Sequence, residues 1–225
     1  MIDLHLFSYE GENGLRRIVE AGRVHLKDKP APLVAYLPLG SLENTWQGQT
    51  EQAFEGLARV ATLHTEMMTV KEMEAILRSA ALLYIPGGNT YLLNYRLHLS
   101  KIMDTLRRKV AGGLPVVAFS AGTVLCGENI LTSNDMNIVP TAWFNGLEAT
   151  HFNLNVHYPE DPVARAIRDD WLSEYHLFHD NPVILMADGA YVRVEGKKAT
   201  LVRGEAWILR QGQEKEVLQA GKAIE

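Results

Sequence analysis

A serine stands at the end of an apolar, β-branched run in the segment "PVVAFSAGTVL". Ser120 is followed by Ala121 and Gly122, two small residues that permit a sharp turn from a strand into a helix. In a nucleophile elbow, such a turn holds a serine hydroxyl exposed above the sheet. The G-x-S-x-G pattern of that elbow would place glycine at position 118, where this chain has alanine. The segment therefore indicates either a nucleophilic serine or a close-packed strand end.

A serine hydroxyl is a weak nucleophile unless a general base activates it and a further group orients that base. Of the eight histidines, His157 stands out because it ends the alternating stretch "FNLNVH" just before a turn. A histidine at a strand end can face the same sheet edge as Ser120. Asp135 and Asp188 both follow strand-like runs. Spacing alone does not decide which of these two acids orients the histidine.

An acyl-transfer site also needs N–H donors for the oxyanion that develops on the substrate. The helix expected after Ser120 begins at Ala121 and presents backbone N–H groups at its N-terminus. The segment "YIPGGNTYLL" predicts a second strand-to-helix turn, in which Gly88 offers another donor. The structural alternative is that both turns serve only close packing, or that they hold a phosphate-type anion.

The elements around these residues alternate between strands and helices. Strands are expected at 4–7, 33–40, 61–67 and 114–119, helices at 15–26, 50–60, 69–80 and 102–110, and a strand, glycine turn and helix over 81–97. This order is typical of a mostly parallel sheet with helices on both faces, an α/β fold. Ligands of such sheets bind at the carboxyl ends of the strands, where both glycine-containing turns would lie.

The last forty residues have a different pattern. They alternate apolar and polar residues around glycine-containing turns, which predicts antiparallel hairpins at the C-terminus. We expect these hairpins to extend the edge of the sheet. Because no stretch of the sequence resembles a linker, residues 1–225 are expected to fold as a single domain.

Composition restricts the function classes. A net charge of −5 provides no basic field for the phosphates of a nucleic acid. No window is long and apolar enough for a membrane span, and the first ten residues do not resemble a secretory leader. Cys126 is the single cysteine, which excludes a disulfide within the chain and fits a reducing compartment. We expect a cytoplasmic protein without nucleic-acid or membrane partners, and composition leaves its oligomeric state open.

Four ordered motifs carry a family resemblance: "IPGGNTYLL", "FSAGTVLCGENILTSNDMNIV", "NLNVHY" and "LMADGAYVRV". Together they span the chain from residue 84 to about 195. With them the chain resembles the S51 serine peptidases, the dipeptidase E (aspartyl dipeptidase) family, which also includes cyanophycinases. The resemblance implies a flavodoxin-like or class I glutamine amidotransferase-like α/β fold. It also implies a reaction that requires no cofactor and no metal.

The same resemblance implies roles for individual residues. Ser120 would be the nucleophile, His157 the base and Asp188 the orienting acid, although the family more typically has glutamate at the last position. The N–H groups of Gly88 and Ala121 would form the oxyanion hole. A further set would bind the substrate or shape the site: Asn89, Thr90, Asp135, Arg165 and Arg168.

The expected substrate is a short peptide, from which the N-terminal residue would be released. The "GGNT" turn favours the dipeptidase branch, because cyanophycinases have a Gly-Gly-Asp-Gln type of turn there. Strict preference for N-terminal aspartate is not expected, since Arg165 and Arg168 stand among acids in "YPEDPVARAIRDD". Three alternatives remain: an esterase or amidase on the same triad, a cyanophycinase-like hydrolase, and a catalytically silent protein that binds a small ligand.

Overall fold

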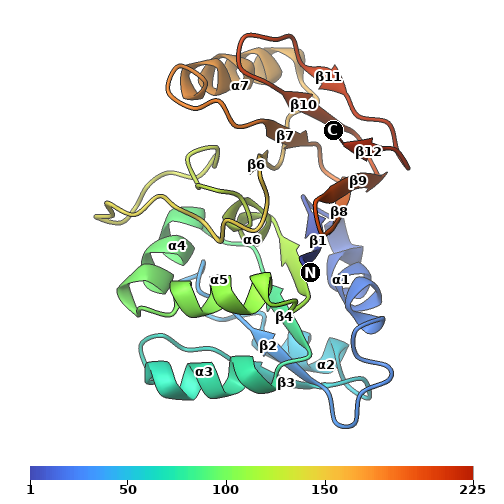
Figure 1. Ribbon diagram of the computed structural model, residues 1–225, viewed down its shortest axis with the longest axis vertical. Coiled ribbons are helices and arrows are strands. Elements are labelled where there is room, and N and C mark those ends of the chain that lie inside the picture. Colours follow the sequence, from blue (N-terminus) through green and yellow to red (C-terminus); the bar gives the residue numbers. More distant parts are fainter. Residues whose placement is uncertain (225) are drawn as a thin grey trace.

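The computed structural model describes residues 1–224 and contains two β-sheets (Figure 1). The larger sheet is built from β1 (Asp3–Phe7), β2 (Leu33–Tyr36), β3 (Arg59–Thr62), β4 (Leu82–Ile85), β5 (Val116–Phe119), β8 (Tyr191–Glu195), β9 (Lys198–Arg203) and β12 (Ala223–Ile224). Its strand order is β12-β9-β8-β1-β5-β4-β2-β3. The five strands from β1 to β3 in this order are parallel, and β8, β9 and β12 are antiparallel to their neighbours. This arrangement confirms the expected α/β fold.

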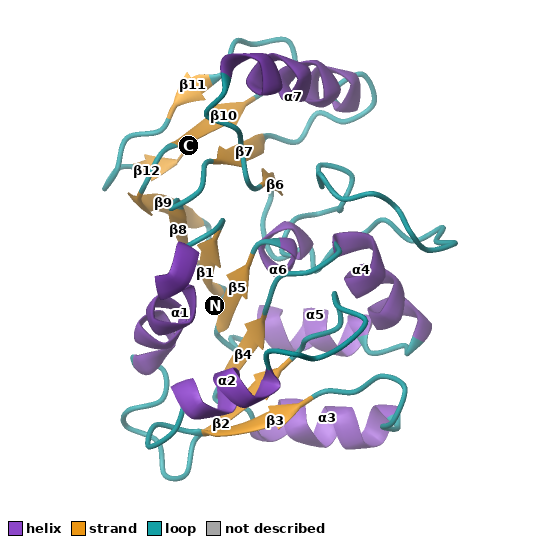
Figure 2. Cartoon of the chain, turned by 180° about the vertical axis from the view of Figure 1, so that it is seen from behind, coloured by secondary structure: helices purple, strands orange, loops and turns teal. Residues whose placement is uncertain are grey.

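Helices cover both faces of the larger sheet (Figures 1 and 2). The described helices are the 3-10 turn η1 (Gly11–Asn13), α1 (Gly14–Arg23), α2 (Gln47–Ala53), α3 (Val70–Ser79), α4 (Thr90–Leu99), α5 (Met103–Ala111), α6 (Ala121–Leu125) and α7 (Pro162–Tyr175). In Figure 2 α1 and α2 lie in front of the parallel strands, with α3 and α5 behind them. Only α7 lies apart, at the far end of the molecule.

Alternate residues of the central strands face the two helical layers. Val34 and Val117 pack with Ile18 of α1, whereas Ala35 and Val116 belong to the core that includes Met73 of α3. The strand segments "LVAY" and "LLYI" are buried throughout, as expected for parallel strands that are covered on both sides. The apolar runs of the sequence therefore become the middle layer of a three-layer structure.

The second sheet contains β6 (Asn153–Asn155), β7 (Val183–Met186), β10 (Ala206–Leu209) and β11 (Glu216–Val217), in the order β11-β10-β7-β6. The strands β6 and β7 are parallel. Helix α7 packs on this sheet through Leu172 and Tyr175, which contact Val183 and Trp207 in a separate apolar cluster. The chain thus places two short parallel strands, each followed by a loop, above the carboxyl ends of the larger sheet (Figure 1).

The expectation that all C-terminal hairpins extend one sheet is wrong for β10 and β11. The strands β8, β9 and β12 do extend the larger sheet, but Gly204, at φ +81°, turns the chain away from it. The next strand, β10, pairs with β7. Both strands are apolar and largely buried, so pairing them satisfies backbone groups that water does not reach.

Two element boundaries also differ from the expectation. The helix expected at 50–60 occupies Gln47–Ala53, and the strand expected at 61–67 occupies Arg59–Thr62. Gly56 adopts φ +74°, a left-handed conformation that ends the helical run and that the apolar periodicity does not reveal. Thr69 and Glu72 form a capping box at the start of α3, with the Thr69 N–H donating to Glu72 Oε2 at 2.7 Å.

None of the helices within residues 1–224 combines the length and the apolar character that crossing a membrane requires.

Candidate active site

Ser120 occupies a strained turn between β5 and α6. Its backbone has φ +51° and ψ −113°, a conformation that a residue with a side chain rarely adopts. The Ser120 N–H donates to the Phe7 carbonyl of β1 at 3.0 Å, and the Ser120 carbonyl accepts from the Thr123 N–H at 2.8 Å. A Cβ atom on Gly122 would overlap the Ile85 carbonyl, so this position requires glycine. The tight backbone has the geometry that the S-A-G sequence predicts.

His157 lies between Ser120 and Asp188. Its Nε2 atom is 2.8 Å from Ser120 Oγ, and its Nδ1 atom is 2.7 Å from Asp188 Oδ1. When Nδ1–H donates to the carboxylate, Nε2 carries the lone pair and faces the hydroxyl, which is the arrangement of a Ser-His-acid triad. The three residues are therefore brought together as the sequence suggests.

The two sheets supply different members of this triad. Ser120 directly follows β5 of the larger sheet, His157 lies two residues beyond β6, and Asp188 lies two residues beyond β7 of the second sheet. His157 also has a positive φ, +54°, so the chain turns sharply where it presents the imidazole. Parallel strands end at the same edge, and in each sheet that edge faces the site. The site is thus assembled across the junction of the two sheets.

Ser8 is a contributor that the sequence did not reveal. It follows β1 and is fully buried, and its Oγ accepts a hydrogen bond from the His157 N–H at 2.9 Å. The same hydroxyl donates to the Met186 carbonyl at 3.2 Å and lies 3.4 Å from Asp188 Oδ1. Ser8 therefore holds the backbone of His157 in place. The only signal was a polar residue after an apolar strand, which becomes informative once β1 is known to lie beside β5.

The loop after β4 approaches the serine closely. A Cβ atom on Gly87 would lie 3.2 Å from Ser120 Cβ, and one on Gly88 would lie 2.5 Å from the Gly40 carbonyl. Gly88 also has φ +133°, which only glycine adopts without strain. No acceptor in the described chain takes up the N–H of Gly88 or of Ala121. The N–H groups of Gly88, in the turn after β4, and of Ala121, in the turn after β5, are thus free to bind a ligand atom near the Ser120 hydroxyl.

Asp135 does not contact His157. Its Oδ2 atom accepts from the Thr90 N–H at 2.7 Å and from the Thr90 hydroxyl at 2.6 Å, at the N-terminus of α4. The Asn89 side chain accepts from the Leu92 N–H at 3.0 Å and donates to the Met136 carbonyl at 2.9 Å. The acid beside His157 is therefore Asp188, while Asn89, Thr90 and Asp135 connect a loop to α4.

The two arginines of α7 are held away from the serine. Arg165 donates through Nε to the Pro159 carbonyl at 2.9 Å, and its guanidinium lies 5.0 Å from the centre of the Trp207 ring. Arg168 donates to Asn155 Oδ1 at 3.3 Å. Burial lowers the pKa of Arg168. Neither Arg165 nor Arg168 lines the cavity beside Ser120.

A cavity of about 470 Å³ opens beside Ser120 and His157. Its walls come from the loops after β1, β2 and β4 together with α1, and they are mainly apolar and aromatic. Tyr36 and Tyr84 stack within it with their ring centres 5.4 Å apart. Burial raises the pKa of both phenols, which are neutral at pH 7. This volume is within the range of small-molecule sites.

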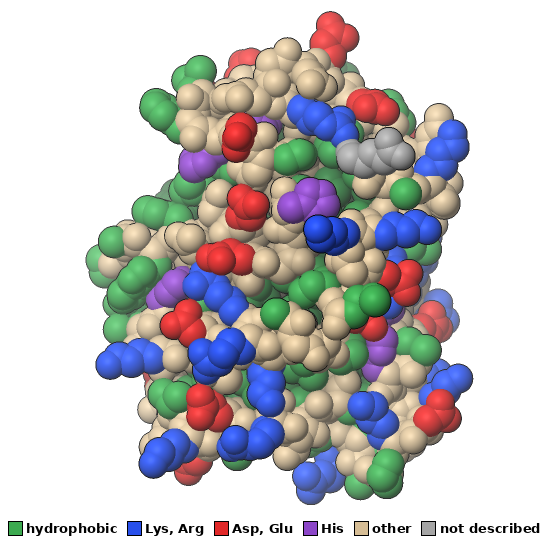
Figure 3. Space-filling view, in the orientation of Figure 1, with side chains coloured by type: hydrophobic (Ala, Val, Ile, Leu, Met, Phe, Trp, Pro, Cys, Tyr) green, Lys and Arg blue, Asp and Glu red, His purple; other side chains and the backbone are tan. Residues whose placement is uncertain are grey.

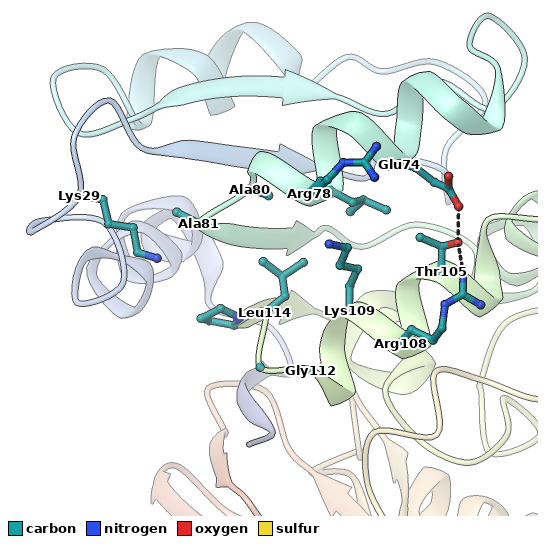
Figure 4. Close-up of a pocket in the computed structure, with 13 residues that line it drawn as sticks. Lys29, Glu74, Arg78, Ala80, Ala81, Thr105, Arg108, Lys109, Gly112 and Leu114 are labelled. Atoms are coloured by element: carbon teal, nitrogen blue, oxygen red, sulfur yellow. Dashed lines mark hydrogen bonds between the residues drawn. The ribbon is translucent and has the colours of Figure 1, made fainter.

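A second cavity of about 550 Å³ lies at the opposite end of the parallel strands (Figure 4). Lys29, Arg78, Arg108 and Lys109 line it, and Figure 3 shows basic side chains gathered over α3 and α5 on this face. Arg108 donates to the Thr105 hydroxyl, which donates to Glu74. The described lining includes no histidine, so this cavity has no counterpart of the Ser120–His157 pair.

One cluster has the residue types of a metal site. His5 Nε2 lies 2.9 Å from His25 Nε2 and 4.0 Å from a carboxylate oxygen of Asp3, near the amino end of β1. The Asp3 carboxylate is already paired with the Arg193 guanidinium. That positive charge opposes the binding of a cation at the same carboxylate. The cluster lies at the other end of β1 from Ser8, so we assign it no part in the chemistry.

Comparison with known proteins places the chain in a family. A model of peptidase family S51 matches residues 8–202. The chain is 38% identical over 149 residues to a probable alpha-aspartyl dipeptidase of Drosophila melanogaster, covering 64% of this chain and 60% of the fly protein. It is 26% identical over 188 residues to peptidase E of a Nostoc species, covering 81% of this chain and 78% of that protein. The match to the fly protein thus spans less than two thirds of its length.

Solved structures show the same fold. A putative peptidase E protein from Listeria monocytogenes superposes with a TM-score of 0.71 at 20% identity, over 91% of this chain and 99% of that chain. A peptidase from an acI-B1 actinobacterium gives 0.75 at 19% identity, over 100% and 97% of the two chains. The family match covers most of the sequence, including Ser120, His157 and Asp188. The chain therefore belongs to peptidase family S51.

Proposed function

We propose that this member of peptidase family S51 is a serine-type dipeptidase that hydrolyses short peptides and releases their N-terminal residue. The observation that carries the proposal is the continuous contact from Ser120 Oγ through His157 to Asp188, at 2.8 and 2.7 Å. Family membership supports a peptidase, and the names of the fly and Nostoc relatives support a dipeptidase.

The mechanism is acyl transfer. His157 Nε2 takes the proton of the Ser120 hydroxyl as its oxygen attacks the scissile carbonyl carbon. The carbonyl oxygen becomes an oxyanion, which the N–H groups of Gly88 and Ala121 stabilise. The C–N bond then breaks, and the imidazolium gives its proton to the departing amine. Water, deprotonated by His157, hydrolyses the serine ester and restores the free hydroxyl.

Asp188 makes the histidine an effective base in this scheme. Its carboxylate accepts the Nδ1 proton, which fixes the imidazole in the tautomer with a free Nε2 lone pair. It also stabilises the imidazolium that forms during attack. The side chain of glutamate, the more typical residue at this position in the family, is one methylene longer. Here Asp188, two residues beyond β7, reaches His157 Nδ1 at 2.7 Å with the shorter side chain.

The proposal extends to the setting of the enzyme. One unit, residues 1–225, carries the reaction, and the residues that support it need neither a cofactor nor a metal ion. The single, buried cysteine fits a reducing cytoplasm. The net charge of −5 supports a protein that does not bind nucleic acid.

Replacement of Ser120 by alanine tests the function. We expect Ser120→Ala to lower kcat/KM for X-Leu dipeptides by at least about a thousandfold, since the nucleophile is lost. Product mass spectrometry should show release of the N-terminal residue by the wild type. Ser173→Ala, at an exposed serine of α7, is the matched control and should retain full activity.

Two results would contradict the proposal. Full dipeptidase activity in a correctly folded Ser120→Ala variant would exclude the serine as nucleophile. A wild-type protein that cleaves p-nitrophenyl esters but no dipeptide would instead be an esterase on the same triad. Circular dichroism and thermal unfolding of each variant establish that the fold is intact.

A further inference from the structure

The cavity beside Ser120 has a charge distribution that does not suit an acidic substrate, although the fly relative is named for aspartyl substrates. Glu43, in the loop after β2, is the only lysine, arginine, aspartate or glutamate among its described lining residues. The Glu43 carboxylate has no hydrogen-bond or ion-pair partner in the described chain, and the residue is exposed at the rim. The cavity therefore has a negative charge and no positive one.

The nearby cations are already engaged elsewhere. Arg96 donates to the Leu39 and Ser41 carbonyls and pairs with Glu66, and it is not among the residues that line the cavity. Arg17 and Arg203 both bind the Glu10 carboxylate, whose side chain is fully buried. A group of basic side chains, Lys29, Arg78, Arg108 and Lys109, lines the cavity at the other end of the sheet (Figure 4). A substrate carboxylate beside Ser120 would thus find no counter-charge.

Aromatic side chains supply most of the recognition surface. Tyr9, Trp46 and Phe119 line the cavity, and the Tyr9 ring lies 6.0 Å from the His157 ring. Tyr36 and Tyr84 also line it but are largely buried. Tyr9 is 47% exposed and Trp46 is 59% exposed, so both present ring surface that no part of the described chain covers. Rings in this arrangement gain free energy when an apolar or aromatic side chain covers them.

The sign of the charge indicates which substrate residue enters. The N-terminal residue of a dipeptide bears an ammonium group, whereas the C-terminal residue bears a carboxylate. Glu43 attracts the first and repels the second. The cavity consequently suits the residue on the acyl side of the scissile bond, the one that becomes esterified to Ser120.

The aromatic lining and the Glu43 charge contribute to substrate preference to different extents. Burying a large side chain among apolar walls favours binding by about 10- to 100-fold, whereas one exposed charge changes it by about fivefold at most. The aromatic wall therefore sets the preference, and Glu43 adds a penalty for an acidic side chain. Repulsive elements of this kind are a general source of specificity.

We propose that this cavity selects an N-terminal residue with a large apolar or aromatic side chain and a free ammonium group, and rejects N-terminal aspartate and glutamate. This inference rests on the proposed dipeptidase function and defines its substrate class. It separates this chain from the specificity that the name of the fly relative states.

The test compares Phe-Leu, Leu-Leu, Ala-Leu and Asp-Leu as substrates of the wild type. We expect kcat/KM for Phe-Leu to exceed that for Asp-Leu by at least tenfold, and N-acetyl-Phe-Leu to be cleaved poorly because it lacks the ammonium group. Glu43→Gln should reduce the Phe-Leu to Asp-Leu ratio by up to about fivefold, since the repulsion of the aspartate side chain is removed while the attraction for the ammonium group is common to both substrates. Glu55→Gln makes the same charge change at an exposed residue outside the cavity and should leave the ratio unchanged.

Binding to the inactive Ser120→Ala protein separates this inference from the proposed function. Calorimetry should show tighter binding of Phe-Leu than of Asp-Leu, whether or not the wild type turns either over. If the wild type cleaves Asp-Leu best and Glu43→Gln does not change the ratio, the inference is overturned while the dipeptidase function stands. If no dipeptide is cleaved but the inactive variant still prefers Phe-Leu, the function fails and the assignment of the cavity stands.

Discussion

At the scale of single residues, the site depends on hydrogen bonds that hold His157 from three directions. Ser120 and Asp188 contact the two ring nitrogens, and Ser8 accepts the backbone N–H. The hydrogen bond from the His157 N–H to Ser8 fixes the position of the backbone from which the imidazole ring extends. Small displacements of a catalytic base have large effects on rate, because attack requires near-ideal geometry.

Ser8→Ala tests this positioning role. The His157 N–H loses its acceptor, so we expect kcat to fall about tenfold while KM changes little, with a cost of about 1–3 kcal/mol in the free energy of unfolding. Steady-state kinetics and urea unfolding measure the two effects. Thr150→Val, which removes another buried hydroxyl hydrogen bond, should lower stability without lowering kcat. Equal loss of kcat in both variants would mean that Ser8 acts only through stability.

The sequence indicated some of these residues and not others. Ser120 was predicted because the strand-to-helix turn leaves a local pattern, and the order of the motifs pointed to His157. Spacing could not choose between Asp135 and Asp188, since the choice depends on which loop meets the second sheet. Ser8 and Glu43 have no local signature at all. Their relevance arises only when β1 and β2 lie beside β5 and β4 in the sheet.

At the scale of elements, the turn between β5 and α6 depends on contact between backbones. Gly122 packs against the Ile85 carbonyl at the end of β4, and the neighbouring Gly88 packs against Gly40. These contacts hold three strand ends together without side chains between them. The elbow is consequently rigid because its neighbours leave it no room to relax.

Gly122→Ala tests that dependence. The added Cβ atom has to displace the Ile85 backbone, so we expect a loss of about 1–3 kcal/mol in the free energy of unfolding and a large loss of kcat. Gly48→Ala is the matched control in α2, where nothing lies within 4 Å of the added atom. It should raise stability by up to about 1 kcal/mol and leave the kinetics unchanged. Wild-type activity in Gly122→Ala would mean that the elbow tolerates displacement.

Strand pairing was the least predictable feature at this scale. Alternation in the C-terminal region correctly indicated hairpins, since β8 and β9 pair as antiparallel neighbours. It did not indicate that β10 would join β7, because an apolar alternation is compatible with either sheet. The parallel part of the larger sheet was easier to predict, since buried apolar strands separated by amphipathic helices have few alternative arrangements.

At the scale of the whole molecule, His5 links stability to pH. Its ring contacts Tyr191 and His25, and its pKa is lowered from 6.5 to about 3, first by burial and then by the charges of Arg193 and His25. Because the folded pKa is below the unfolded one, the unfolded chain binds the proton first as pH falls. The stabilisation is complete above about pH 6.5 and is progressively lost between pH 6.5 and 3.

Urea unfolding at several pH values measures this contribution. Between pH 6.5 and 5 we expect His5 to account for a loss of about 2 kcal/mol in the free energy of unfolding. His5→Phe should remove that part of the slope, whatever its effect on absolute stability. His151→Gln changes an exposed histidine and should retain the wild-type slope. Identical slopes in all three proteins would show that His5 titrates normally in the folded state.

The division of the triad between two sheets has a consequence for protein synthesis. During translation the ribosome releases β5 and the Ser120 elbow well before β6 and β7. A nascent chain can therefore complete most of its larger sheet while its serine still lacks both base and orienting acid. In the proposed mechanism, Ser120 gains its base and its orienting acid only after Asp188 has emerged and the second sheet has paired. The order of the residues along the chain thus makes assembly of the proposed triad a late step of folding.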